Sequence, residues 1–188
     1  SGRNDIQGGA GVDTIYGGNE RDIIIGGGSG DYLFGQGGDD DIYGDSTNND
    51  STIASGNDYI WGGDGDDNIW GGRGNDEITA GAGHDDVWAG IGDDKVWGGA
   101  GNDNLFGEKG NDWIWGEGDL DHIFGGDDND NLDGGNGGSG GVDYLEGGAG
   151  RDTFYRHLGL TWTGWSSDGD IFSDFNFSDD AVDEEYHW

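Results

Sequence analysis

The sequence predicts an all-β solenoid, in which short parallel strands stack coil upon coil with two strands in each coil. Three observations predict this fold class. A nine-residue period runs from Gly8 to Tyr155, its eighth place is apolar in every unit, and glycine recurs in the turns between these places. A unit of nine residues cannot bury its own apolar side chain, so neighbouring units must stack to form a continuous core.

The bulk composition taken alone argues against any fold. The 188 residues include 41 Asp or Glu but only 7 Lys or Arg, for a formal net charge of -34. Such a charge with so few aliphatic residues is typical of disordered chains. However, 9 Trp and 0 Pro are unusual for a flexible linker. The conflict is resolved if something external neutralises the acidic residues. The charge also excludes nucleic acid as a partner, because phosphate binding needs a basic face.

The repeat is defined by two places that never vary in character. The segment from Gly8 to Tyr16 sets the template, and fifteen units fit it. The sixth place always holds aspartate: Asp13, Asp22, Asp31, Asp40, Asp58, Asp67, Asp76, Asp85, Asp94, Asp103, Asp112, Asp121, Asp130, Asp143 and Asp152. The eighth place always holds an apolar residue: Ile15, Ile24, Leu33, Ile42, Ile60, Ile69, Ile78, Val87, Val96, Leu105, Ile114, Ile123, Leu132, Leu145 and Phe154.

Each unit is expected to contribute one strand of about three residues between six-residue glycine-rich turns. Strand side chains alternate between the two faces, so the eighth-place residue points inward and its neighbours point outward. Two units then complete one coil. Coils stacked about 4.8 Å apart would form two parallel sheets that face each other across one file of aliphatic side chains.

Two insertions and one terminal segment depart from the period. The intervals from Asp40 to Asp58 and from Asp130 to Asp143 are too long for one unit, and we expect surface loops near 44–52 and 136–140. A strand in the first loop is disfavoured because its eighth place would be Ser51. From Arg156 the period is lost. The sequence therefore predicts a repeat domain over 1–155 and a C-terminal cap over 156–188 that covers the open end of the solenoid.

The chemistry of the turns indicates calcium. Glycine at the first, second and fourth places allows a tightly bent backbone that directs several carbonyl oxygens at one point. With the sixth-place aspartate the ligand set contains only oxygen, which Ca²⁺ accepts and Zn²⁺ does not prefer. Without a cation, aspartates stacked about 5 Å apart would repel by about 3 kcal/mol per pair. We therefore expect all fifteen sixth-place aspartates to be calcium ligands, about ten to thirteen ions to bind, and folding to require them.

The unit resembles the Gly-Gly-x-Gly-x-Asp-x-apolar-x nonapeptide of the repeats-in-toxin (RTX, hemolysin-type calcium-binding) family, and the resemblance covers Gly8 to Tyr155. It implies a right-handed parallel β-roll with a C-terminal capping segment and with Ca²⁺ bound between adjacent turns. It also implies a secreted, extracellular bacterial protein that leaves the cell unfolded by type I secretion. The stretch from Asp168 to Phe175 is similar to the segment that follows the repeats in family proteases. Non-glycine residues replace the fourth-place glycine at Glu20, Ser29, Asp119 and Asp128, where sites would be weaker.

The ninth place is aromatic in eleven of the fifteen units, and these rings are expected to point outward. If the loop near 44–52 adds no strand, one sheet carries a row of Ile25, Tyr43, Trp70, Trp88, Phe106 and Phe124. One interpretation is that the rings stack in register and stabilise the sheet. The other is that they form a strip that binds a glycan or an adjoining domain.

No sequence feature indicates catalysis. His84, His122, His157 and His187 share no metal-ligand spacing, and no nucleophile, base and orienting group occur together. With 0 Cys there is no thiolate metal site, and no segment approaches the roughly 20 apolar residues of a membrane span. We therefore expect a non-enzymatic calcium-binding module. The alternatives are a carbohydrate-binding accessory module of a secreted polysaccharide-modifying enzyme and an adhesin-type interaction module.

Overall fold

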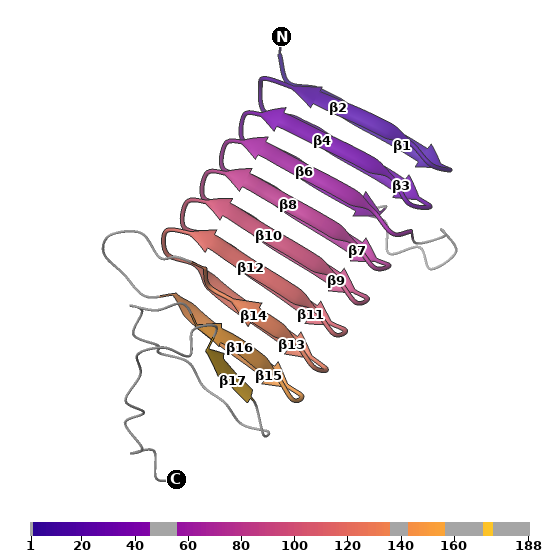
Figure 1. Cartoon of the computed structure of the whole chain (residues 1–188). Helices are drawn as coiled ribbons and strands as arrows, with labels where there is room; N and C mark the ends of the chain where they lie inside the picture. The colour runs from indigo at the N-terminus through magenta and orange to yellow at the C-terminus, as the bar shows by residue number, and fades with distance from the viewer. Residues whose placement is uncertain (1, 46–55, 136–142, 157–170, 175–188) are drawn as a thin grey trace.

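The computed structural model describes residues 2–45, 56–135, 143–156 and 171–174, which form seventeen strands in two parallel sheets (Figure 1). Sheet A contains β1 (Asp5–Ala10), β3 (Ile23–Gly28), β5 (Asp41–Asp45), β7 (Asn68–Arg73), β9 (Asp86–Ile91), β11 (Asn104–Lys109), β13 (His122–Asp127) and β15 (Tyr144–Ala149). Sheet B contains β2 (Thr14–Gly18), β4 (Tyr32–Gly37), β6 (Tyr59–Asp64), β8 (Glu77–Ala82), β10 (Lys95–Ala100), β12 (Trp113–Gly118), β14 (Asn131–Asp133), β16 (Thr153–Arg156) and β17 (Ile171–Asp174).

Successive strands alternate between the two sheets, so two nine-residue units complete each coil. From β1 to β16 every odd-numbered strand lies in sheet A and every even-numbered strand in sheet B. Pairs in the register are 18 residues apart where no insertion intervenes, as Val96 is with Ile78 and with Ile114. The predicted parallel β-solenoid is confirmed, and its architecture is that of a parallel β-roll.

The strands are longer than the sequence pattern predicts. We expected about three residues, but most strands have six, such as β7. The three additional residues are the first three places of the next unit, which remain extended beyond the apolar place. Pairing skips the first of them, since Trp97 pairs with Trp115 and Gly99 with Glu117 while Gly98 has no partner in the register. A positive φ at the second place, +115° at Gly99, then allows the ladder to resume.

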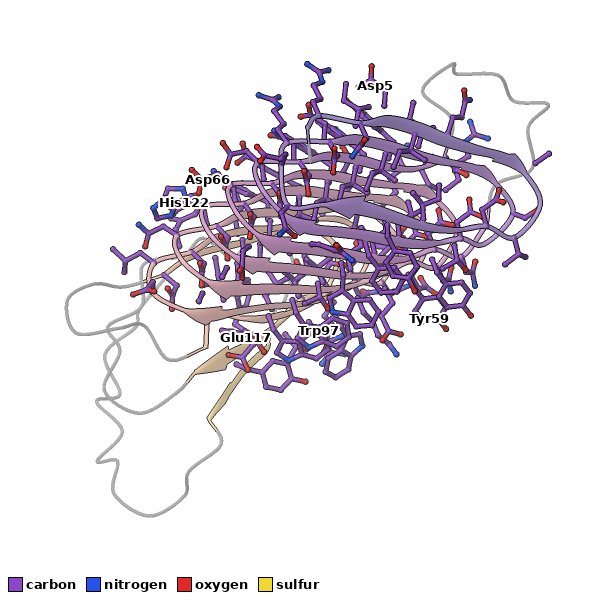
Figure 2. All side chains as sticks on the ribbon, turned by 90° about the horizontal axis from the view of Figure 1, so that it is seen from above. Asp5, Tyr59, Asp66, Trp97, Glu117 and His122 are labelled. Atoms are coloured by element: carbon purple, nitrogen blue, oxygen red, sulfur yellow. The ribbon has the colours of Figure 1, made fainter. Side chains whose placement is uncertain are left out.

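The core is the file of eighth-place side chains between the sheets, as predicted. Every residue from Ile24 to Leu132 in this place has 0% exposure, and Ile15, Leu145 and Phe154 at the two ends remain buried. Ala80 and Ala89, which occupy the first place of two units, are buried in the same cluster. Viewed from above, the side chains lie inside the roll and on both outer faces, with Tyr59 and Trp97 on the same side (Figure 2).

The insertions do not interrupt the sheets. Gly44 and Asp45, which we assigned to the first loop, belong to β5, and residues 46–55 lie outside the described residues. Strand β5 pairs with β7 and β4 pairs with β6, so the register continues across the insertion. The second insertion, with residues 136–142, also lies outside the described residues.

The predicted cap is described only in part. Strand β17 extends sheet B by pairing in parallel with β16, from Thr153 with Ile171 to Arg156 with Asp174. The remainder of 156–188, which includes His157 and His187, lies outside the described residues. In the described part of the chain, no helix is long and apolar enough to cross a membrane.

Candidate metal centre

The structure brings the sixth-place aspartates together in two columns, one at each edge of the roll. Each aspartate ends a turn and directly precedes a strand, so the start of that strand fixes the position of its side chain. Asp13 is half-buried and the others are buried, with exposures from 0 to 4%. One column contains Asp13, Asp31, Asp58, Asp76, Asp94, Asp112, Asp130 and Asp152, and the other contains Asp22, Asp40, Asp67, Asp85, Asp103, Asp121 and Asp143.

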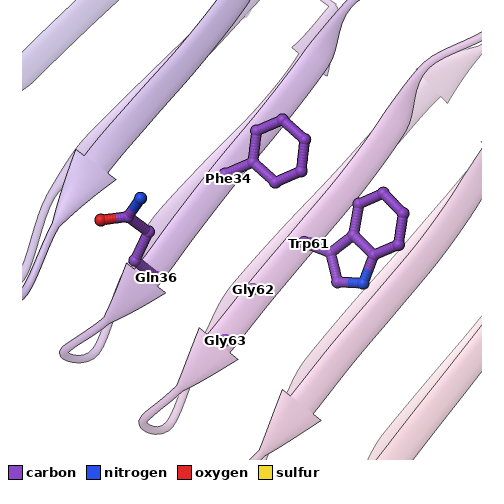
Figure 3. Close-up of a pocket in the computed structure, with 5 residues that line it drawn as sticks. All are labelled: Phe34, Gln36, Trp61, Gly62 and Gly63. Carbon is purple, nitrogen blue, oxygen red and sulfur yellow. The ribbon is translucent and has the colours of Figure 1, made fainter.

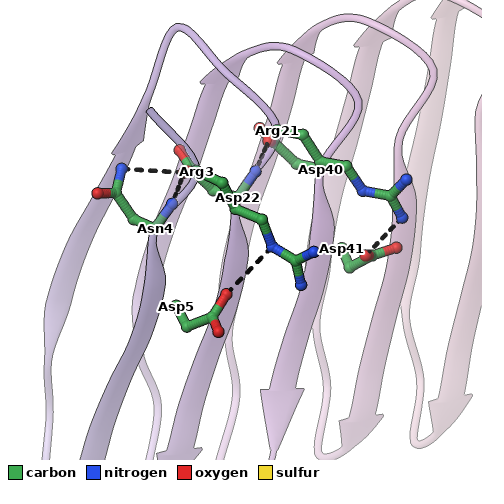
Figure 4. Close-up of polar contacts among 7 residues, drawn as sticks. All are labelled: Arg3, Asn4, Asp5, Arg21, Asp22, Asp40 and Asp41. Carbon is green, nitrogen blue, oxygen red and sulfur yellow. Dashed lines mark hydrogen bonds and ion pairs between the residues drawn. The ribbon is translucent and has the colours of Figure 1, made fainter. Parts of the chain in front are cut away.

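From Asp22 onward, one carboxylate oxygen of each sixth-place aspartate connects successive coils. The backbone N–H of Asp22 donates to Oδ1 of Asp40 at 2.7 Å, and Asn4, in the half unit that precedes the first repeat, donates to Oδ1 of Asp22 at 2.6 Å (Figure 4). The same bond crosses the first insertion, from Asp31 to Asp58 at 2.7 Å. It also crosses the second, from Asp121 to Asp143 at 3.1 Å. The columns are therefore continuous through both insertions.

The other carboxylate oxygen, Oδ2, lacks such a partner among the described residues at most of these aspartates. From Asp13 to Asp130, every sixth-place Oδ2 is buried and accepts no hydrogen bond from the described residues. A carbonyl oxygen of the next coil lies close by: a methyl group added to Gly98 would lie 2.6 Å from Asp103 Oδ2 and 2.9 Å from Gly116 O. Because buried polar atoms are normally satisfied, these oxygens require a partner that carries positive charge. The residues present thus fit a hard cation such as Ca²⁺.

No basic side chain supplies that charge within the described residues. Both ion pairs found there lie on the outside of the coils (Figure 4), between Arg3 and Asp5 at 3.3 Å and between Arg21 and Asp41 at 2.8 Å. Neither pair involves a sixth-place aspartate. The columns are therefore rows of buried like charges.

The sixth-place carboxyl groups from Asp31 to Asp143 have raised pKa values. Burial is the main cause, the N–H donated by the preceding aspartate partly offsets it, and neighbouring carboxylates raise the pKa further, as Asp94 and Asp58 do at Asp76. The pKa is raised to about 8 at Asp67, Asp76, Asp112 and Asp121, to about 7 at Asp58, Asp85 and Asp130, and to about 6 at Asp40, Asp94 and Asp103. Without a bound cation, the carboxyl groups with a pKa of about 8 would therefore be largely protonated at neutral pH.

Sequence reasoning missed one acidic residue near this centre. Asp45 stands at the second place of the interrupted unit, and its Oδ2 accepts the backbone N–H of Arg73 at 2.8 Å. Its Oδ1 is buried without a hydrogen-bond partner among the described residues, and its charge raises the pKa of Asp58. The sequence signal was available, because Asp45 stands at a place where most units have glycine, but the residue had been assigned to a loop.

The turns keep a positive φ at most fourth places that lack glycine. Ser29, Asp119 and Asp128 have φ values of 78°, 70° and 79°, whereas Gly101 in the same place has 130°. Such dihedrals are costly for residues with a side chain. The weaker sites expected at these turns stay a prediction.

The two described histidines make contacts within the protein. His84 Nδ1 accepts the backbone N–H of Asn102 at 2.9 Å, and the ring of His122 meets Tyr144 edge-on at 6.0 Å. Among the described residues no three His, Asp or Glu side chains gather closely enough to hold a metal alone. Any site in the columns must therefore rely on carbonyl oxygens in addition to carboxylates.

Lowering the pH should stabilise the metal-free fold. The raised pKa values of about 6 to 8 exceed the value of about 3.9 in an unfolded chain, so the folded state binds more protons in this window. The stabilisation is complete below about pH 4 and is lost as the pH rises through 6 to 8. In metal-free buffer, circular dichroism should show more strand at about pH 5.5 than at about pH 8.5. Equal strand content at both values would contradict buried, uncompensated carboxylates.

Comparison with known proteins identifies the repeat. The family model described as RTX calcium-binding nonapeptide repeat (4 copies) matches residues 1–33, 16–50, 54–78, 61–96, 79–114, 88–121, 106–137 and 138–157. These matches cover most of the chain and both aspartate columns. A search of the curated proteins gives no match.

Proposed function

The chain belongs to the RTX calcium-binding nonapeptide repeat family, and from this premise we propose that it is a non-catalytic module that folds when calcium binds to its aspartate columns. The fifteen sixth-place aspartates are its ligand residues. The alternation of two sheets makes each turn a neighbour of the turn one coil away, so a cation between coils contacts both.

The observation that carries the proposal is the row of buried Oδ2 atoms, from Asp13 to Asp130, that accept no hydrogen bond from the residues that the structure describes. Oδ1 already accepts a backbone N–H, so the carboxylate is held in one orientation, with Oδ2 beside the carbonyl oxygen of the next coil. Calcium, when bound, supplies the positive charge that these oxygens lack. Since the unfolded chain does not hold these oxygens together, binding and folding are coupled.

The setting that suits this coupling is outside the cell. The family is typical of secreted bacterial proteins, and we infer that this chain is exported before it folds. Without calcium, the charge of -34 keeps the chain extended, which favours passage through a secretion channel. Calcium concentrations of about 10⁻⁴–10⁻³ M, the range used by extracellular modules, then drive folding.

The number of bound ions tests the proposal. We expect about ten to thirteen Ca²⁺ per chain by equilibrium dialysis with metal analysis, because ions are shared between neighbouring turns and the ends lose some. About twelve ions would change the net charge from -34 to about -10. Fewer than about five ions would mean that the aspartate register serves another purpose.

A pair of substitutions in one turn provides the matched control. Asp67 is buried in a column, whereas Asp64, three residues earlier, is exposed. Asp67→Asn should remove about one or two ions and raise the calcium concentration needed for folding, since it removes the carboxylate charge. Asp64→Asn should leave both quantities unchanged. Equal losses in the two variants would show that calcium responds to overall charge and not to the columns.

A further inference from the structure

Ninth-place rings form a stacked row on the outer face of each sheet. On sheet A the row is continuous as predicted, through Tyr43, Trp70, Trp88, Phe106 and Phe124, with ring centroids 4.5 to 5.7 Å apart. On sheet B, Tyr16 stacks on Phe34 and Phe34 on Trp61 at 5.5 Å, and a second segment begins at Trp97. The row on sheet B is therefore interrupted, while that on sheet A is not.

The interruption on sheet B lies at Thr79. Thr79 is in register with Trp61 on one side and with Trp97 on the other. Two strand spacings place the strands of these tryptophans about 10 Å apart. This distance is close to twice the ring spacing in the row, so the gap has room for one more ring stacked on both faces.

A second gap in the same row shows what fills such a space. Asp133 stands in register between Trp115 and Tyr155, and there the chain closes the gap itself. The ring of Trp113 lies 5.6 Å from that of Trp115 and 6.1 Å from that of Tyr155, tilted by 26° to each. At the Thr79 gap the residue that corresponds to Trp113 is Tyr59, whose ring stacks on Tyr32 at 5.1 Å, on the side of β6 away from the gap. The seventh-place residues of the next two strands, Glu77 and Lys95, have no ring.

Polar groups surround the Thr79 gap. Glu77 and Lys95 are directly paired in the register, two places from Thr79 and Trp97 on the same outer face. No ion pair joins them, and neither side chain forms an ion pair with any other residue in the part of the chain that the structure describes. The gap therefore combines two aromatic faces with a hydroxyl, a carboxylate and an ammonium group that can bond to a ligand.

The gap is also accessible. Trp61, at one side of the gap, is 45% exposed. A hollow of about 320 Å³ lies on the other side of its ring, towards Phe34, and is also lined by Gln36, Gly62 and Gly63 (Figure 3), so it is a neighbour of the gap and not part of it. Tyr59 and Trp97 lie on this same side of the roll (Figure 2). Exposed aromatic surface of this kind on a chain with so few apolar residues marks a binding site more often than chance exposure.

We propose that the Thr79 gap binds one ring of a neutral, β-linked glucose chain. A β-glucopyranose ring carries its hydroxyl groups at the edge and C–H groups on both faces, which suits two flanking indoles and a polar rim. The aromatic side chain of a protein partner would stack equally well but would leave Glu77 and Lys95 unused. Acidic polysaccharides are disfavoured by the charge of -34. This inference goes beyond calcium binding and requires only that the chain be folded.

The test uses cellohexaose and laminarihexaose, titrated separately into the calcium-loaded full chain by calorimetry and tryptophan fluorescence. We expect at least one to bind. Thr79→Trp, which fills the gap as Trp113 fills the other, should weaken binding by about tenfold or more. Thr14→Trp adds an indole to the same sheet three coils away and should leave binding unchanged. If Thr79→Trp disturbs the fold, Trp61→Ala provides a second test. It removes one stacking face and should also weaken binding.

Circular dichroism on the same samples separates this inference from calcium-driven folding. If the chain folds but neither oligosaccharide binds at millimolar concentration, the glycan proposal is wrong and the calcium proposal stands. Undiminished binding by a folded Thr79→Trp variant would also overturn it. Binding of N-acetyltryptophanamide without binding of either sugar would assign the gap to the aromatic side chain of a protein partner instead.

Discussion

A chain that ends at Arg156 should fail to fold at calcium concentrations that fold the full chain. Strand β17 pairs with β16 over four residues, and its removal leaves β16 as an unpaired edge. Phe154, the last residue of the core file, is 2% exposed and would lose its neighbour strand on one side. In a solenoid each unit is stabilised by its neighbours, so an open end lowers the stability of the whole array. We expect the calcium midpoint, measured by circular dichroism, to rise several-fold or to become unreachable.

A second truncation locates the effect. A chain that ends at Asp174 keeps β17 and removes the rest of the predicted cap. Folding of this chain at the normal calcium midpoint would assign the capping role to β17. If the chain that ends at Arg156 also folds normally, the segment 156–188 is not a cap, and a role in export or in docking to a partner becomes the better interpretation.

Gly101→Ala should be among the most damaging single methyl additions in the repeats. Gly101 has a φ of 130°, and an added Cβ would overlap the carbonyl oxygen of Gly83 in the preceding coil. The backbone would have to move towards the φ of 70° found at Asp119, and the turn would separate from its neighbour. We expect a loss of about 2–4 kcal/mol of folding free energy in calcium, seen as a lower melting temperature and a higher calcium midpoint.

Gly37→Ala is the matched control for this substitution. Gly37 lies in a strand end with no positive φ, and its added methyl group would be 3.7 Å from the nearest atom, an ordinary contact. Its effect should stay within about 0.5 kcal/mol. Similar losses for both glycines would mean that the turns tolerate side chains and that close coil packing does not determine stability.

The period made the core and the columns predictable from sequence. A residue that recurs every nine places must occupy equivalent positions in every coil, so Ile78 could be assigned to the core and Asp76 to a column without coordinates. The same reasoning placed Tyr43 beside Trp70 across the first insertion, and the two rings are stacked at 4.5 Å. Every sixth- and eighth-place residue that we named has the position expected for it.

The features that the period could not predict depend on local dihedrals and rotamers. The predicted strand length was wrong because hydrophobic alternation does not encode the backbone conformation at glycines such as Gly98 and Gly99. The bond from a backbone N–H to Oδ1 depends on the rotamer of each aspartate. Trp113 closes the Asp133 gap because its ring packs against those of Trp115 and Tyr155. The seventh place is polar in most units, so the sequence did not predict this packing. Asp45 was missed because it follows the unit before the first insertion and was assigned to the loop.

The most direct test of the account is circular dichroism of the full chain at about pH 8, first in chelator and then with increasing calcium. The account predicts little strand content in chelator, because buried carboxylates in two continuous columns repel one another with no cation between them. Strand content should then appear cooperatively at about 10⁻⁴–10⁻³ M calcium. Full strand content in chelator, unchanged by calcium, would contradict the claim that the columns need a cation for the chain to fold.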